Sequence, residues 1–235
     1  RPESHWTDRF NIFLESFSYR RMIGRADRVI VSSFYSAPPL YDGVAVVPPI
    51  LRAEVRQTEA TDGNHLLVYL NKGPHQFTPK VERTLRSYDG PVRIYGVDHR
   101  PRTDGNLTFR PPSNLPFVED LASCRAVVST AGNQLVGETV YFGKPMLVIP
   151  ERTVEQRLNA YALGRLGIGM RVPLWRIRPD VLQAFLEREG EYRENVARLV
   201  QDGLGESLRM IENYIHELSG QPDPRPDRLP KAETA

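Results

Sequence analysis

The sequence predicts an α/β protein built on a parallel sheet. Several short segments are apolar at nearly every residue, which is typical of strands buried on both faces of a parallel sheet. Helical segments separate them, and such alternation favours right-handed strand–helix–strand units. The expected buried strands are residues 65–70 (HLLVYL), 92–97 (VRIYGV), 126–129 (AVVS) and 146–150 (MLVIP).

The first fifty residues predict the end of another α/β unit. Phe10, Phe13, Leu14 and Phe17 recur at helical spacing, so we expect a helix over 9–24 that ends near Gly24. Apolar runs at 28–33 and 44–47 predict short strands, and a proline-rich segment joins them.

The remaining elements follow from apolar periodicity. Helices are expected at 77–88, 133–142 and 155–166, and a short strand at 106–109. After Pro173 the pattern is helical, with helices predicted at 179–190, 191–201 and 204–218.

Composition changes suggest where one unit ends and the next begins. Thr61-Asp62-Gly63 is a turn signal at the end of a polar stretch. The tail is rich in proline and charge, so we expect disorder there. The expected organisation is the C-terminal part of an N-terminal α/β domain (1–50), a linker (51–61), a complete α/β domain (62–175), closing helices (176–218) and a disordered tail (219–235).

Bulk properties narrow the class of protein. The 235 residues are 40% hydrophobic and 26% charged, as in ordinary globular proteins, and no stretch resembles a membrane span or a signal peptide. A net charge of +2 gives no support for nucleic-acid binding. The single Cys124 excludes an internal disulfide and favours a reducing compartment, so we expect a cytoplasmic location. Because the chain starts at Arg1, we expect part of its front to be missing.

The segment STAGNQ (129–134) follows a buried strand and opens a helix. Small residues let a ligand approach the backbone closely, and a helix N-terminus offers N–H groups that suit a diphosphate. Gln134 and Glu138 share one helix face, and the Glu138 carboxylate could accept hydrogen bonds from both hydroxyls of a ribose. The alternative is a plain N-terminal turn with a solvated glutamate.

Two further segments end at the same predicted sheet edge. After 146–150, Glu155, Gln156 and Asn159 could hold sugar hydroxyls, although this segment taken alone favours a solvated helix start. After 65–70, Gly73 permits close approach of a ligand. In the same loop Lys72 and His75 could meet phosphate, with plain exposure as the alternative for His75.

Other motifs are absent. The glycines of GRLGIG (164–169) are in the wrong order for a dinucleotide-binding turn, and Gly143-Lys144-Pro145 lacks the rest of a P-loop. No D-x-D occurs, so no metal site is expected. The G-x-S-x-G motif of serine hydrolases is absent too, and no cofactor is expected.

The order and spacing of these segments resemble the C-terminal, donor-binding half of GT-B glycosyltransferases. The likeness is to glycosyltransferase family 28, which includes the enzyme that makes lipid II, and to the related family 1, and it covers residues 62–172. Its carriers are Gly132, Glu138, Gly143-Lys144-Pro145, MLVIP, Gln156 and Asn159-Ala160. The resemblance implies a GT-B type fold, with a Rossmann-like parallel-sheet C-terminal domain and the remaining part of a truncated N-terminal α/β domain.

Carried over by position, the resemblance implies a role for each segment. Gly132, Asn133 and Gln134 surround the diphosphate, and Glu138 holds the ribose. Gln156, with Glu155 beside it, contacts the donor sugar. The stretch LPFVEDLASC resembles the segment whose backbone reads the base, which implies Val118 as the base contact, with Phe117 and Glu119 completing that loop.

The chain also departs from the family pattern. Ser129 or Thr130 stands where family 1 members often have histidine, and Thr130 where the lipid II enzyme has arginine. The loop after 65–70 lacks the usual Gly- and Ser-rich run. No catalytic residue is assigned, because the family's base lies in the N-terminal domain.

The resemblance also implies where the last helix lies. A closing helix commonly crosses over in this fold, so we expect residues 204–218 to pack back toward residues 1–50. Its apolar residues Leu204, Leu208, Ile211 and Ile215 repeat at helical spacing and need a surface to cover.

The implied function is inverting, metal-independent transfer of a sugar from a nucleotide diphosphate-sugar to an acceptor hydroxyl. The acceptor is unknown and is expected to be a small molecule, a glycan or a lipid-linked sugar, so the protein could act peripherally at a membrane. Two alternatives stay open: a nucleotide-sugar 2-epimerase, and a non-catalytic donor-binding subunit that needs a partner chain.

Overall fold

The computed structural model describes residues 13–14, 17–18, 21, 26–36, 38–39, 42–98 and 100–220. The helix predicted over 9–24 and the disordered tail predicted over 219–235 lie largely outside these described residues.

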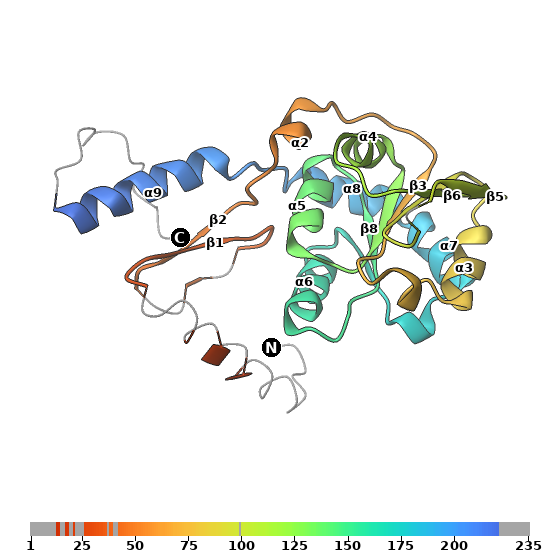
Figure 1. The fold of residues 1–235 in the computed structure, drawn as a ribbon, viewed down its shortest axis with the longest axis horizontal. Helices are drawn as coiled ribbons and strands as arrows, with labels where there is room; N and C mark the ends of the chain where they lie inside the picture. The colour runs from red at the N-terminus through yellow and green to blue at the C-terminus, as the bar shows by residue number, and fades with distance from the viewer. Residues whose placement is uncertain are drawn as a thin grey trace.

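The predicted parallel sheet is present (Figure 1). Its strands lie in the order β5-β6-β4-β3-β7-β8-β9, and every neighbouring pair is parallel except β5 with β6. The order reverses between β3 and β7, and ligands of open α/β sheets bind at such a point, outside the carboxyl ends of the strands. The strands are β3 (Leu66–Tyr69), β4 (Val92–Tyr95), β5 (Arg102–Asp104), β6 (Leu107–Arg110), β7 (Ala126–Ser129), β8 (Met146–Val148) and β9 (Gly169–Arg171).

Helices cover both faces of the sheet, and alternate residues of each strand separate the two cores. Leu67 of β3 packs with α4, α5 and α6, whereas Leu66 and Val68 pack with α3 and α7. Both faces of the strand are therefore buried, which explains its uninterrupted apolar sequence. The helices are α3 (Pro79–Arg86), α4 (Leu115–Ser123), α5 (Asn133–Tyr141), α6 (Val154–Arg165), α7 (Pro179–Glu187) and α8 (Glu189–Ala197).

Local capping explains where two of these helices begin. Thr78 precedes Pro79 and accepts a hydrogen bond from the Val81 N–H, while Thr153 accepts one from the Gln156 N–H. Each threonine satisfies a backbone donor that the first helical turn leaves unpaired.

Several elements were not expected from the sequence. β5 is polar and fully exposed at the sheet edge, and β9 has only three residues, so neither has an apolar run. The short helix α2 (Ala53–Gln57) lies in the predicted linker. The stretch LPFVEDLASC, which we expected to form a loop, is helix α4; its apolar residues point into the core as Leu121 and Ala122.

A smaller unit stands beside the seven-stranded sheet. Strands β1 (Val29–Ser32) and β2 (Val44–Val47) form a separate parallel pair, and α9 (Leu204–Ser219) runs along them (Figure 1). The Gly203 N–H donates to the Pro49 carbonyl at 2.8 Å, so α9 starts against the chain that leaves β2.

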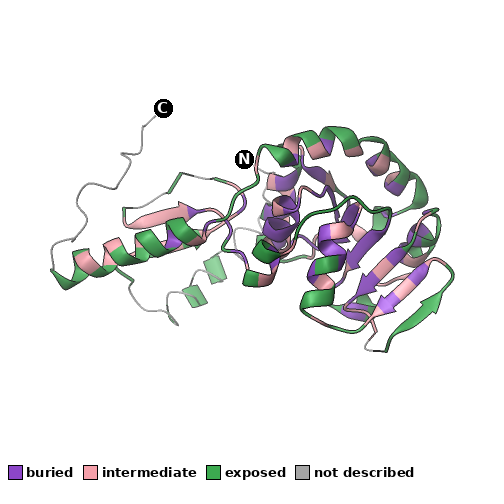
Figure 2. Ribbon diagram, turned by 90° about the horizontal axis from the view of Figure 1, so that it is seen from above, coloured by how far each residue is buried: buried purple, intermediate pink, exposed green. Residues whose placement is uncertain are grey.

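The position of α9 agrees with the expectation that it packs back toward residues 1–50. Arg28 pairs with Glu217 and lies over the Tyr214 ring at 5.8 Å. We also expected a surface to cover its apolar residues. That part differs: Leu208 and Ile215 are 52% and 59% exposed, and Figure 2 shows α9 as mostly exposed or intermediate.

Candidate functional site

A hollow of about 800 Å³ lies where the strand order reverses, outside the carboxyl ends of β3, β4 and β7. We call it the α5 hollow, because the N-terminal turn of α5 forms one wall. Its lining includes five of the residues predicted from the sequence, which are Gly132, Asn133, Gln134, Glu138 and Glu155.

The entrance turn of α5 is built by small residues and one buried amide. Ala131 adopts φ +69°, a left-handed conformation that is uncommon for a residue with a side chain. The Asn159 Nδ2 donates to the Ala131 carbonyl at 3.0 Å and holds it in place. Gly132 then caps the helix, and nothing lies within 4 Å of where a Cβ on Gly132 would be, so its backbone faces open space.

Glu138 is the most deeply buried acid of the α5 hollow. It is 2% exposed, and its carboxylate accepts hydrogen bonds from Arg52 Nε at 2.8 Å and Arg52 Nη2 at 2.9 Å. Gln134 Nε2 adds a third hydrogen bond at 2.9 Å. The hydrogen bond to Glu138 raises the pKa of Arg52, against the lowering effect of burial. Glu138 is therefore not the solvated glutamate of the alternative interpretation.

The chain that precedes the seven-stranded sheet also contacts the first turn of α5. Asn133 Nδ2 donates to the Ser32 carbonyl at 3.0 Å, and Gln134 Nε2 lies 3.4 Å from the Ile50 carbonyl. The polar face of α5 thus joins the end of β1 and the chain after β2 to the main sheet.

Aromatic rings form the opposite wall. Phe117 meets Tyr95 edge to face, with ring centroids 5.0 Å apart, and meets Tyr69 at 5.7 Å. The Tyr95 hydroxyl donates to Asp120 at 2.6 Å, and burial together with this bond raises its pKa, so it stays protonated. Phe117 is only partly buried, and such a ring beside polar groups is suited to stacking against a nucleobase.

The other predicted residues lie outside this lining. Val118 is fully buried in the core, and its N–H donates to the Asn114 carbonyl within α4. Gln156 is 7% exposed, and its Oε1 accepts from the Glu151 N–H. Gly73 is buried with φ +54°, and a Cβ there would lie 2.8 Å from the Gly96 carbonyl, so the close approach that it permits is to the chain itself.

Sequence reasoning missed Arg52 and the two tyrosines. Tyr69 and Tyr95 lie in strands, where the sequence pattern predicts that an aromatic residue belongs to the buried core. Arg52 is one of many arginines in a polar stretch, and its partner Glu138 lies 86 positions away, so no local signal identifies it.

A second hollow, of about 1040 Å³, adjoins the first across Thr130, which lines both. We call it the Trp175 hollow. Lys72 and His75 line it rather than the α5 hollow. Burial alone would raise the pKa of Glu151 here, but hydrogen bonds from Lys72 and neighbouring groups hold it below its ordinary value.

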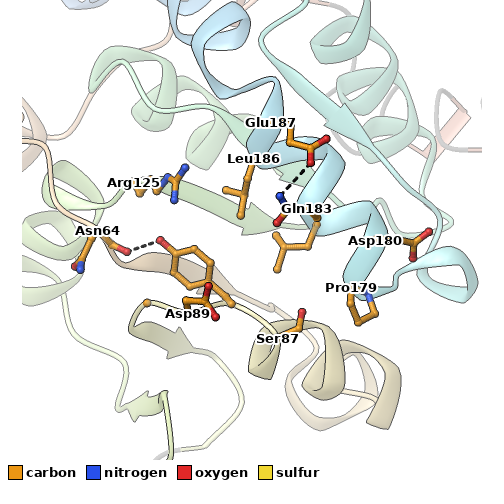
Figure 3. Close-up of a pocket in the computed structure, with 12 residues that line it drawn as sticks. Asn64, Ser87, Asp89, Arg125, Pro179, Asp180, Gln183, Leu186 and Glu187 are labelled. Carbon is orange, nitrogen blue, oxygen red and sulfur yellow. Dashed lines mark hydrogen bonds between the residues drawn. The ribbon is translucent and has the colours of Figure 1, made fainter.

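A third hollow, of about 720 Å³, lies at the amino-end edge of the sheet (Figure 3). Two pairs of its polar residues are hydrogen-bonded to each other: the Tyr88 hydroxyl donates to the Asn64 carbonyl, and Gln183 donates to Glu187. It lies away from the edge where open α/β sheets bind ligands, so we do not assign it a role.

Metal clusters and membrane-spanning helices are both absent from the described residues. No group of three or more His, Cys, Asp or Glu side chains there could hold a metal ion. No helix in this part of the chain is both long and apolar enough to cross a membrane.

Comparison with known proteins identifies the fold. Residues 8–189 match the family model described as Glycosyl transferase family 1. A comparison with curated proteins gave no match. The closer likeness to family 28 stays a prediction.

Solved structures of glycosyltransferases share the GT-B fold of this chain. CalG4, the calicheamicin glycosyltransferase, has 19% identity and a TM-score of 0.64, over 93% of this chain and 62% of that one. The glycotransferase of kitacinnamycin has 20% identity and a TM-score of 0.62, over 87% and 60%. UGT2 of Phytolacca americana, complexed with UDP-2-fluoro-glucose and pterostilbene, has 16% identity and a TM-score of 0.58, over 82% and 53%. The chain thus spans about 60% of the length of the first two.

Proposed function

Because this chain belongs to glycosyl transferase family 1, we propose that it binds a nucleotide diphosphate-sugar in the α5 hollow and transfers the sugar to an acceptor hydroxyl. The observation that carries this proposal is the convergence, in one hollow, of a helix N-terminus, a buried carboxylate and an aromatic wall. These suit the diphosphate, ribose and base of one ligand.

Each part of the donor has a partner of matching chemistry. The base stacks on Phe117, and the ribose hydroxyls donate to Glu138. The diphosphate lies at Gly132, Asn133 and Gln134, where the first N–H groups of α5 and its dipole favour negative charge. The donor sugar extends toward Glu155 and Gln156 at the start of α6.

The proposed chemistry is inversion at the anomeric carbon without a metal. The acceptor oxygen attacks as the bond to the diphosphate breaks, so negative charge grows on the departing phosphate. Fixed N–H donors at α5 stabilise that charge, and one such donor contributes roughly 3 kcal/mol in known enzymes. The catalytic base and the acceptor remain unassigned. We propose that donor domain, linker and closing helices are divided as the sequence predicts.

Direct binding tests this function. Calorimetric titration with UDP, dTDP, GDP and ADP should give saturable binding of at least one of them, with affinity unchanged by EDTA. Absence of binding by all four would overturn the proposal, and loss of binding on chelation would overturn its metal-independent form. Release of free sugar from the matching nucleotide-sugar without acceptor would favour the epimerase alternative.

A further inference from the structure

Arg52 is paired with the Glu138 carboxylate, the same group that the proposed donor site uses to hold the ribose hydroxyls. Its guanidinium meets both oxygens of Glu138, and Gln134 meets Oε1 as well. Ribose hydroxyls would need to donate to the same oxygens. A carboxylate has about four acceptor positions, and burial at 2% exposure leaves few directions of approach. Nucleotide and Arg52 therefore compete for Glu138.

Arg52 is the more exposed partner of this ion pair. Its side chain is 34% exposed, and it precedes the short helix α2 without making a side-chain cap bond there. Glu138, by contrast, is a buried residue in the middle of α5. When the pair separates, the arginine is the partner that moves.

The charge of the α5 hollow indicates where the guanidinium goes. Among the described residues that line this hollow, Arg52 is the only lysine, arginine or histidine, whereas Glu138 and Glu155 are acidic. A diphosphate bound here would meet two carboxylates and a single cation. Guanidinium pairs with phosphate oxygens in a two-pronged geometry that lysine cannot reproduce.

We propose that Arg52 changes partners when the donor binds, leaving Glu138 to the ribose hydroxyls and pairing with the diphosphate. This inference rests on the proposed donor site and adds a specificity-determining residue to it. A nucleoside without phosphates must displace Arg52 and offers it no new partner. A nucleoside diphosphate offers its phosphate oxygens to the Arg52 guanidinium, and this new ion pair replaces the one lost with Glu138. Arg52 thus makes the site select phosphorylated nucleosides.

A plain ion pair between two segments of the chain is the competing explanation. Such a pair would matter for stability, and its loss would weaken all ligands alike. The partner-exchange role instead predicts opposite effects on nucleoside and nucleoside diphosphate. The ratio of the two affinities separates the explanations even if stability changes.

The test compares Arg52→Gln, Arg52→Lys and Arg56→Gln with the wild type. Arg56 lies one helical turn later and pairs with Asp202 at 3.9 Å, outside the α5 hollow, so it is the matched control. Calorimetry measures the nucleoside diphosphate that the wild type prefers, and ligand-observed NMR measures the matching nucleoside.

Arg52→Gln should bind the nucleoside as well as the wild type or better, and the diphosphate about tenfold or more weakly, since charge-assisted bonds to phosphate are lost. Arg52→Lys should lose less of the preference, and Arg56→Gln none. An unchanged affinity ratio in Arg52→Gln would overturn the inference while leaving the donor site intact. A wild type that binds no nucleoside diphosphate would overturn both.

Discussion

At Phe117, one side chain links the core to the proposed base site. Its ring packs against Tyr69 and Tyr95, and it also lines the α5 hollow. The sequence placed Phe117 beside the base only through resemblance. The ring geometry adds a physical reason, because every nucleobase has a face that can stack on an aromatic ring.

Phe117→Leu tests this contact by keeping apolar volume and removing the ring. Stacking of a base on an aromatic side chain contributes about 1–3 kcal/mol, so nucleoside diphosphate affinity should fall about tenfold. Calorimetry gives the affinity, and a thermal melt checks that the fold is retained. An affinity equal to that of the wild type would place the base elsewhere.

Site residues were predictable from the sequence where a local pattern marks them. Gly132 and Glu138 follow a buried strand at recognisable spacing, and both line the hollow. The role of Asn159 in holding the sugar stays a prediction, and the structure shows in addition that its amide supports the strained Ala131 turn from another helix. A side chain that acts through a backbone carbonyl 28 positions away leaves no local pattern. Arg52 was unpredictable for a similar reason, because its partner Glu138 lies 86 positions away.

Among the elements, β3 is preceded by a buried histidine that joins it to α4. His65 is 4% exposed, and its Nε2 lies 2.9 Å from the Asp120 carbonyl of α4. Burial lowers the pKa of His65 below its ordinary value of 6.5, and nearby Arg93 and Lys144 add to that effect, although the Asp120 carbonyl opposes it. The fold therefore favours the neutral ring.

Stability should consequently fall as the solution is acidified through and below pH 6.5. In that range the unfolded chain binds a proton that the folded chain does not, so the free energy of unfolding decreases with decreasing pH. Thermal melts from about pH 7.5 to about pH 5 should show a smaller decrease for His65→Gln than for the wild type. Parallel curves would show that His65 does not contribute.

Element boundaries were predictable for strands and helices with strong apolar patterns. β3, β7, α5 and α6 agree with the sequence to within a few residues. α4 was expected to be a loop. It contains Pro116 and the acids Glu119 and Asp120, and its buried face is short, so its apolar pattern is weak. Within the described sheet β5 has β6 as its only neighbouring strand, and such pairing has no signature in an exposed polar segment.

For the whole molecule, the two cores indicate which part folds as a unit. Apart from Phe34, every residue of both buried clusters lies between Leu51 and Val196. β1, β2 and α9 contribute little to these cores and leave Val31, Leu208 and Ile215 partly or largely exposed. The division into domains remains our proposal.

A shortened chain of residues 51–203 tests that proposal. It keeps Arg52 and both cores except Phe34, but loses the Ser32 and Ile50 carbonyls that Asn133 and Gln134 contact. We expect one cooperative melt and nucleoside diphosphate affinity within about thirtyfold of that of the full chain, because two neutral hydrogen bonds are lost and each contributes about 1 kcal/mol. A chain that fails to unfold cooperatively would show that the smaller unit is needed for folding.

The central claim is that Glu138 holds the ribose of a nucleotide donor. Calorimetry should compare wild type, Glu138→Ala and the control Glu82→Ala, whose carboxylate pairs with Arg86 on α3 far from the hollow. Each is titrated with the preferred nucleoside diphosphate and with its 2′,3′-dideoxy form.

We predict that Glu138→Ala, while still folded, binds the ordinary nucleotide about tenfold to a few hundredfold more weakly, since hydrogen bonds to a charged group contribute about 1.5–3 kcal/mol each. The dideoxy form should bind wild type weakly and should lose no affinity on the substitution, because it has no hydroxyls for Glu138 and Arg52 is then free to pair with its diphosphate. Glu82→Ala should behave as wild type. Equal affinity of Glu138→Ala and wild type for the ordinary nucleotide would contradict the account.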